Sequence, residues 1–404
     1  MTMNKVKIYS SDLVWYVFFI SSLLLPPVVK MTHYIMTAFL FLWTISRGRF
    51  QLNRKYVFCL IWFSLFAVYI SVSKLWAITN VVSQDNIIIA VAEAVIVLFC
   101  ILQYVRNEKY LHRLIEIFAN AMVVIAIAYY ITSPLDTWGT ERMGTWLSIW
   151  RNSAGYYFGF ASLMVLDVYY YKRNKVLLFQ FLFLMTTSLG TGSRKIFLLY
   201  GTALIAFVIL QPKLIKKAKW IVGAAIVIAV VVLLLFQIPA FRDMYLNRIH
   251  LLLQGEDSTD ASTLVRLMLR DYAMNLFKGR PVFGWGLEGF YIWISGQGAF
   301  LRTWNMSPTY SHCNFTELLA NFGVIGFSLY YLFPVLQMLQ GIKFRSNPLV
   351  RFGLIIVITC LILDIGTVGY YYKFSLYILW IGLISIIYGV MNGKEVCGCK
   401  TIKE

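Results

Sequence analysis

The sequence predicts an all-α polytopic membrane protein with about 12 transmembrane helices and one long extracytoplasmic loop that contains short helices. Of its 404 residues, 60% are hydrophobic and only 13% are charged, whereas a soluble domain carries roughly 25% charged residues. The apolar residues gather in runs suited to helices that cross a bilayer, and short clusters of Lys and Arg separate these runs. Together these observations exclude a soluble globular enzyme, a disordered chain and a fibrous repeat.

The predicted spans are apolar runs of about 20 residues. With both termini in the cytoplasm, the Lys and Arg clusters fall in every second loop, as the positive-inside rule requires. A miscount by one span would break this alternation. The predicted spans are residues 12–29, 32–46, 56–79, 86–104, 114–132, 153–171, 175–191, 196–211, 220–238, 317–337, 350–369 and 374–391.

The net charge of +18 does not indicate a nucleic-acid partner. The basic residues lie in short loops between apolar runs, which suits an anionic cytoplasmic leaflet of membrane lipid. The six cysteines show no disulfide framework and no zinc-ligand spacing. The first apolar run, residues 13–29, has no small-residue cleavage site after it, so we expect a retained span.

These spans divide the chain into four parts. Residues 1–238 form a bundle of nine predicted spans, and residues 239–316 form the extracytoplasmic loop domain. Residues 317–391 form three more predicted spans, and residues 392–404 form a cytoplasmic tail. The loop is far longer than the other connections, and long loops in membrane enzymes commonly carry function.

Two helical segments are expected in the loop. Residues 262–278 predict a helix that Asp260 or Ser262 can cap and that ends before Pro281. Residues 241–254 are amphipathic and suit the membrane surface.

Arg266 and Arg270 are four residues apart on the predicted loop helix and therefore share a face. Like charges at this spacing repel each other. An anion bound between the two arginines would attract both and make the arrangement favourable. Arginine is well suited to phosphate because it offers a planar fork of donors. A solvated basic face, or arginines that reach lipid phosphates, explains the same spacing.

Three further residues lie near the predicted outer surface. Arg194 follows Gly192 where the chain re-enters the membrane, as a ligand-binding residue or as an interface anchor. His312 precedes the tenth span, and imidazole can take a proton near neutral pH. A hydrogen-bonded structural histidine is the other interpretation. Glu317 begins that span and can orient His312 or pair with an arginine.

The remaining acidic residues favour structural roles. Glu93, Asp167 and Asp364 lie inside predicted spans, where an internal salt bridge or a hydrogen-bonded acid is the simplest explanation. The acidic turn at 256–260 fits no standard cation loop, so no metal site is predicted. Walker, D-x-D and dinucleotide patterns are absent from the sequence, which disfavours an ATP or nucleotide-sugar site and any cofactor.

The chain resembles the bacterial superfamily of O-antigen ligases and surface-polysaccharide polymerases. The resemblance in sequence motifs covers residues 190–335 well, and outside them it rests on the predicted arrangement of membrane spans. Its elements agree in order, spacing and membrane side. They are Ser311-His312-x-Asn314-Phe315-x-Glu317-Leu318-Leu319 with Phe322-Gly323-Val324-Ile325-Gly326, Arg266 before Pro281-x-x-Gly284-x-Gly286, Thr191-Gly192-Ser193-Arg194, and Arg142-x-Gly144-Thr145 with Asn152.

The resemblance implies a glycosyltransferase that acts on the outer face of the bacterial cytoplasmic (inner) membrane. Its donor would be a glycan linked to undecaprenyl pyrophosphate, with Arg194 and Arg266 on the pyrophosphate and His312 at the acceptor. Arg142, Arg270, Asn314 and Glu317 are further candidates for substrate binding. A metal is not required if the arginines meet the charge of the leaving group.

The H-x-N-F form of the histidine motif is more similar to polymerases of capsule, exopolysaccharide or O-antigen than to ligases. The sequence therefore favours a polymerase that transfers a growing glycan to the terminal sugar of a lipid-linked repeat unit. A ligase with a different acceptor is the close alternative, and a flippase of lipid-linked oligosaccharides is an alternative of another class. A flippase and a chain-length regulator of the same pathway are the expected protein partners.

Overall fold

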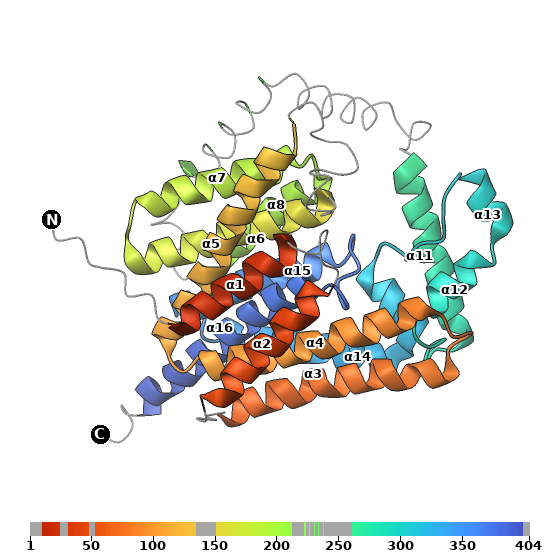
Figure 1. Ribbon diagram of the computed structural model, residues 1–404, viewed down its shortest axis with the longest axis horizontal. Helices are drawn as coiled ribbons and strands as arrows, with labels where there is room; N and C mark the ends of the chain where they lie inside the picture. The colour runs from red at the N-terminus through yellow and green to blue at the C-terminus, as the bar shows by residue number, and fades with distance from the viewer. Residues whose placement is uncertain are drawn as a thin grey trace. The chain divides into compact units, whose positions relative to one another are not determined.

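The computed structural model describes residues 10–24, 31–47, 53–134, 151–211 and 261–398, with isolated positions between 222 and 237 (Figure 1). Within these ranges every regular element is a helix, as the sequence predicts. The chain divides into two compact units that alternate along the sequence. The first consists of Met1–Gln51, Cys100–Tyr200 and Lys219–Met244, and the second of Leu52–Phe99, Gly201–Ala218 and Tyr245–Glu404.

The first unit is organised around one helix, α5 (Glu108–Thr132), which packs against α1, α6 and α7. The α1 helix also contacts α2, and α6 contacts α7. Leu114, Phe118 and Met122 of α5 are fully buried, which shows that α5 supplies the apolar centre of this unit. The other helices are α1 (Ser10–Leu24), α2 (Thr32–Ser46), α6 (Arg151–Lys172), α7 (Val176–Gly190) and the first residues of α8 (Arg194–Leu210).

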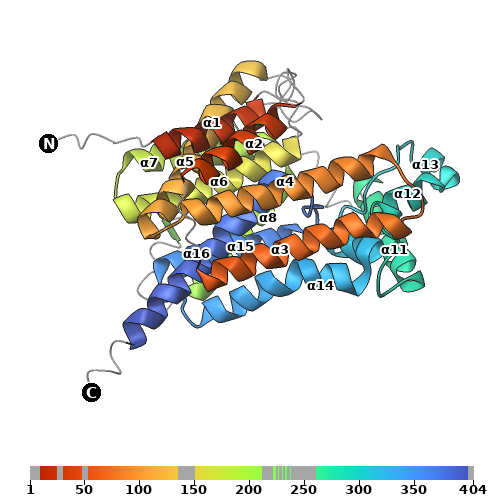
Figure 2. The same cartoon turned by 60° about the horizontal axis from the view of Figure 1, so that its bottom comes forward.

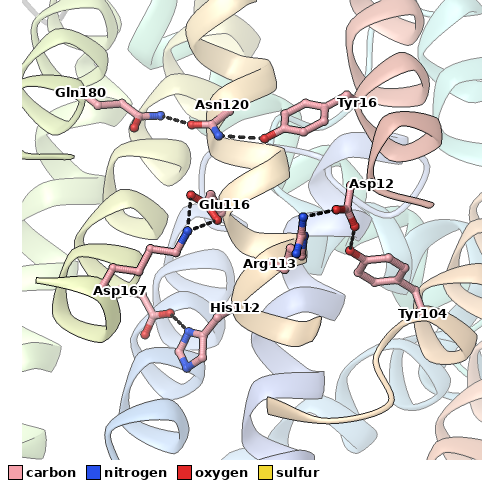
Figure 3. Close-up of polar contacts among 10 residues, drawn as sticks. Asp12, Tyr16, Tyr104, His112, Arg113, Glu116, Asn120, Asp167 and Gln180 are labelled. Atoms are coloured by element: carbon pink, nitrogen blue, oxygen red, sulfur yellow. Dashed lines mark hydrogen bonds and ion pairs between the residues drawn. The ribbon is translucent and has the colours of Figure 1, made fainter. Parts of the chain in front are cut away.

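Polar side chains of α5 bind partners on the neighbouring helices (Figure 3). Arg113 pairs with Asp12 of α1, which also accepts a hydrogen bond of 2.6 Å from the Tyr104 hydroxyl. His112 Nδ1 lies 2.8 Å from Asp167 Oδ2 on α6. Each ionic group therefore has a partner, which is the condition for keeping charges among apolar helices.

Two further α5 residues extend this set of contacts. Lys172 at the end of α6 donates to the Glu116 carboxylate at 2.6 Å. Asn120 donates to the Tyr16 hydroxyl at 2.9 Å and accepts from Gln180 of α7 at 2.7 Å. One helix thus fixes the rotation of α1, α6 and α7 through polar contacts as well as through packing.

The second unit is organised around α14 (Asn314–Ile342), which packs against α3, α11, α12, α15 and α16. Figures 1 and 2 both show α3 and α14 side by side, with α11 and α12 at one end of α14. The other elements are α3 (Arg54–Ser73), η1 (Lys74–Trp76), most of α4 (Val82–Tyr104), α11 (Ala261–Gly279), α12 (Gly289–Ser295), α13 (Gly298–Thr303), α15 (Pro348–Leu363) and α16 (Lys373–Gly398).

Each predicted span in the described part of the chain coincides with a helix, but these helices differ in length. Within the described residues, five helices are long and apolar enough to cross a membrane. They are Arg54–Trp76, Ser83–Tyr104, Glu108–Thr132, Asn314–Ile342 and Lys373–Asn392. Shorter apolar helices lie at Ser10–Leu24, Val176–Gly190 and Pro348–Leu363. A multi-pass membrane protein is supported, and the count of twelve spans stays a prediction.

The predicted loop domain is described from residue 261 onward. The helix expected over 262–278 is confirmed, since α11 covers Ala261–Gly279. The ninth predicted span, 220–238, and the amphipathic segment 241–254 lie outside the described ranges, apart from isolated positions. The described part of the loop also contains two short helices, α12 and α13, whose positions the sequence did not predict.

Candidate functional site

The backbone around His312 has a conformation that few residues adopt. His312 has a φ of 58°, in the left-handed region, which histidine visits more readily than most non-glycine residues. Its ring centroid lies 4.4 Å from that of Tyr310. The side chain of His312 is half-buried, whereas Ser311 and Cys313 on either side are buried. The imidazole is therefore presented at the surface of a segment that is itself held inside the protein.

Glu317 holds this segment through its backbone. The buried carboxylate accepts a 2.6 Å hydrogen bond from the Ser311 N–H at Oε2. Asn321 Nδ2, one turn further along α14, donates to Oε1 at 3.2 Å. Glu317 therefore holds the backbone of Ser311, the residue directly before His312.

Asn314 connects the start of α14 to the loop at 364–372. Its Nδ2 donates to the Tyr331 hydroxyl at 2.8 Å and to Asp364 Oδ2 at 3.1 Å. Its Oδ1 accepts from the N–H groups of Gly369 and Tyr370 at 2.9 and 3.3 Å. These four bonds use both donors and both acceptor positions of the amide. In this structure Asn314, fully buried, therefore positions protein groups rather than facing a substrate.

The two loop arginines have different surroundings. Arg270 donates from Nη2 to the carbonyl of Ile365 at 2.6 Å, which ties α11 to the 364–372 loop. The positive charge of Arg266, one turn earlier on α11, acts on the phenol of Tyr310. Burial raises the pKa of Tyr310 to about 12, and the positive charge of Arg266 opposes this rise. The second unit thus brings Arg266, Tyr310, His312 and Glu317 into one neighbourhood.

Gly284 of the Pro281-x-x-Gly284-x-Gly286 motif and Gly323 of α14 permit a close backbone contact between the two segments. Gly323 interrupts α14 with φ 63° and ψ −165°, a combination essentially restricted to glycine. A Cβ at Gly323 would lie 2.3 Å from the Val282 carbonyl oxygen, and one at Gly284 would lie 2.4 Å from the Asn321 carbonyl. No side chain fits between these two segments.

Backbone hydrogen bonds replace those that the break removes from α14. The N–H groups of Trp285 and Gly286 donate to the carbonyls of Ala320 and Asn321 at 3.0 and 2.8 Å. In the other direction, the Val324 N–H donates to the Pro281 carbonyl at 2.8 Å. Polar backbone groups at a helix break must be satisfied by protein when lipid surrounds the helix. The motif is therefore a docking segment that fixes the end of α14 carrying Glu317 and Asn321.

Arg194 belongs to the first unit and is the first residue of α8. It is exposed, and it follows a tight turn in which Gly192 has a φ of 67°. The Thr191 hydroxyl donates to the Ser188 carbonyl at 2.7 Å, and the Ser193 N–H donates to the Thr191 hydroxyl at 3.4 Å. The Thr-Gly-Ser sequence thus forms the turn that presents Arg194. Arg142 lies outside the described residues.

The acidic residues within predicted spans are paired, as expected. Glu93 of α4 forms an ion pair with Lys373 of α16, and Asp167 contacts His112. Asp364 accepts hydrogen bonds from Asn314 and Tyr331. Within the described part of the chain, groups of three or more His, Cys, Asp or Glu residues that could hold a metal ion are not found.

These observations describe a multi-pass membrane protein. Its arginine–histidine cluster, Arg266 and His312, lies in the segment of the chain that precedes α14. A family model described as O-antigen ligase matches residues 179–331. This match includes Arg194, Arg266, His312 and the docking segment, and it supports the resemblance to the superfamily of O-antigen ligases and surface-polysaccharide polymerases. A comparison with curated proteins gives no significant match. The resemblance seen in the sequence motifs is confirmed for the superfamily.

Proposed function

We propose that the protein is a surface-polysaccharide polymerase. It transfers a glycan from undecaprenyl pyrophosphate to the terminal sugar of a second lipid-linked repeat unit, on the outer face of the bacterial inner membrane. The observation that carries this proposal is the neighbourhood of Arg266, Tyr310 and His312 within the region that matches the family. A cation for a leaving pyrophosphate and a base for an acceptor hydroxyl are the two groups that such a transfer needs.

In the proposed reaction, the acceptor oxygen attacks the anomeric carbon of the donor glycan. The bond between that carbon and the pyrophosphate oxygen breaks, and undecaprenyl pyrophosphate leaves. His312 takes the proton of the acceptor hydroxyl and later releases it to water or to the leaving pyrophosphate. Arg266 binds the pyrophosphate and stabilises the negative charge that grows on it. Arg194 is the other arginine to which the family resemblance gives this role. The products are a lengthened lipid-linked glycan and free undecaprenyl pyrophosphate.

A ligase that transfers the glycan to a different acceptor is the second candidate, because the matching family model is described as O-antigen ligase. The same arginine and histidine chemistry serves both reactions, and only the acceptor differs. A flippase explains these residues less well, since transport requires neither a leaving-group site nor a base.

Purified protein in lipid nanodiscs, given lipid-linked repeat units, tests the proposal directly. We expect products longer than one repeat, also with a chelator present, since the proposed site uses arginine in place of a metal. Surface glycan from a deletion strain separates the candidates. Single repeats indicate a polymerase, unattached polymer indicates a ligase, and no outward transfer indicates a flippase. Activity that a chelator abolishes and a divalent cation restores would contradict the arginine-only mechanism.

A further inference from the structure

A cavity of about 260 Å³ lies within the second unit. Its lining includes four tyrosines, Tyr291, Tyr310, Tyr370 and Tyr371, and two carboxylates, Glu288 and Glu317. These residues come from α12 and the residue directly before it, from the segment before α14, from α14 itself and from the loop before α16. The volume is slightly below the roughly 300–1,000 Å³ of pockets for drug-sized ligands, so it suits a single small ring.

The lining has the chemistry of a site for an uncharged, hydroxyl-rich ring. Tyrosine offers an apolar face for the C–H side of such a ring and a hydroxyl at its edge. Carboxylates accept hydrogen bonds from hydroxyl groups. Among the described residues that line the cavity there is no Lys, Arg or His, and the charged groups in direct contact with it are the carboxylates Glu288 and Glu317. A ligand with a carboxylate or phosphate of its own would therefore face like charge at these two residues.

Glu288 is fixed in place by its neighbours on both sides. Its backbone is left-handed, with a φ of 57°, which carries strain for a residue with a side chain. The Ser83 hydroxyl of α4 donates to its Oε2, and Gln84 Nε2 donates to the preceding carbonyl, of Leu287, at 2.8 Å. Its other carboxylate oxygen, Oε1, accepts no hydrogen bond from the described residues. One acceptor of a held carboxylate is therefore available at the cavity.

The cavity adjoins the candidate base. Tyr310 lines the cavity and its ring also lies beside that of His312, with 4.4 Å between the ring centroids and 53° between the ring planes. Glu317 lines the cavity and holds the Ser311 N–H next to His312. The cavity thus lies on the His312 side of the cluster, where an acceptor hydroxyl would be needed.

We propose that this cavity is the acceptor-sugar subsite, that it takes an uncharged sugar ring, and that Glu288 binds a hydroxyl of that ring. Its acceptor role rests on the proposed transfer reaction, whereas ring binding itself does not require transfer. The proposal names a substrate class: the terminal acceptor sugar is a neutral hexose or N-acetylhexosamine rather than a uronic acid or a phosphorylated sugar.

Binding is measured on the full-length protein in nanodiscs by saturation-transfer NMR. The probes are the methyl glycosides of neutral hexoses and N-acetylhexosamines, with methyl glucuronide as the acidic counterpart. We expect binding of at least one neutral glycoside and at least tenfold weaker binding of the glucuronide. Loss of one hydrogen bond to a charged group predicts about tenfold weaker binding for Glu288→Gln. Tyr291→Phe, which removes only a hydroxyl, is the second variant and should weaken binding less.

Asp271→Asn is the matched control, since Asp271 is exposed on α11 and does not line the cavity. Equal binding of glucuronide and neutral glycosides, absence of binding by every neutral glycoside, or wild-type binding by both cavity variants would overturn the subsite. Transfer is measured separately with lipid-linked acceptor. Glycoside binding that depends on Glu288 without any transfer would reject the proposed function and keep the subsite. Transfer with an unchanged acceptor KM in Glu288→Gln would reject the subsite and keep the function.

Discussion

At the scale of single residues, His312 is the group whose chemistry decides the proposed mechanism. A positioned general base contributes about 10²- to 10⁴-fold to rate, so His312→Ala should lose activity by that factor while donor binding persists. His312→Asn is the matched control, because asparagine also tolerates the left-handed backbone found at this position. Polymer formation and donor binding at equal protein level provide the measurement. Near wild-type turnover in His312→Asn would leave His312 as a positioning residue.

Arg266 gives the second prediction. Because a lysine ammonium cannot reproduce the guanidinium fork, Arg266→Lys should be a poor substitute. Hydrogen bonds to charged groups contribute roughly 1.5–3 kcal/mol each, so Arg266→Ala should lower kcat/KM at least about tenfold. Arg302→Ala, which removes an exposed charge from α13, is the control and should have little effect. An active Arg266→Ala protein with normal donor KM would refute the donor-site role.

Glu288 gives a prediction about pH. Burial raises the pKa of its carboxyl, while the hydrogen bond from Ser83 opposes this rise. A carboxyl with a higher pKa in the folded than in the unfolded protein lowers stability as pH rises through about 4.3 and above. Glu288→Gln cannot ionise, so its Tm should increase relative to the wild type between about pH 4 and pH 7. Thermal unfolding of both proteins checks this, and a relative decrease would contradict it.

The sequence could indicate a candidate site residue only where that residue belongs to a motif or a regular spacing. Arg266, His312 and Glu317 were identifiable because each is a polar residue in a recognisable motif at the predicted outer surface. Glu288, Tyr370 and Tyr371 were missed, since they meet only through folding and follow no common period. Tyr291 and Tyr310 are aromatic residues of the loop, and no sequence signal separates such residues from those that line a membrane interface.

At the scale of elements, the break in α14 is the feature most sensitive to a single methyl group. Gly323→Ala would place a Cβ 2.3 Å from the Val282 carbonyl oxygen at a φ of 63°. The conformational strain alone is of the order of 1–3 kcal/mol. We expect reduced folded protein and loss of activity, measured by size-exclusion yield and polymer formation.

Gly201→Ala is the matched control for this variant, because its Cβ would meet nothing within 4 Å on α8. Alanine also suits a helix interior better than glycine. Equal yields and activities for the two variants would show that the docking of 281–286 onto α14 does not govern the site.

Sequence patterns predicted long elements well and short ones poorly. The α11 helix was predicted over 262–278 because a cap, an apolar period and a terminal Gly-Arg-Pro sequence agree. The bounds of α12 (seven residues) and α13 (six residues) were not predictable, since such helices are too short to show a period. The break at Gly323 was also invisible, because the apolar run continues on both sides of it.

At the scale of the whole molecule, the predicted membrane topology decides on which side of the membrane the candidate site lies, and the other predictions depend on it. Thr303, exposed on the described part of the loop, should be outside, and Ser346, exposed between α14 and α15, should be inside. In a cysteine-free background, an impermeant thiol reagent should label Thr303→Cys on intact cells and Ser346→Cys only after lysis. The reverse pattern would invert the orientation, and labelling of both on intact cells would break the predicted alternation of spans.

Membrane insertion gives the break in α14 a further consequence. The ribosome makes residues 281–286 before α14, yet a helix that enters lipid alone must satisfy its own backbone groups. The Ala320 and Asn321 carbonyls accept hydrogen bonds from the N–H groups of Trp285 and Gly286. Without residues 281–286 docked, these carbonyls would lack hydrogen bonds in lipid, so the break can form only after docking. We therefore expect α14 to insert as a continuous helix and to break late, once the preceding loop has crossed the bilayer. A docking defect would then yield an inserted but immature protein, exposed to quality-control proteolysis rather than to failure of translocation.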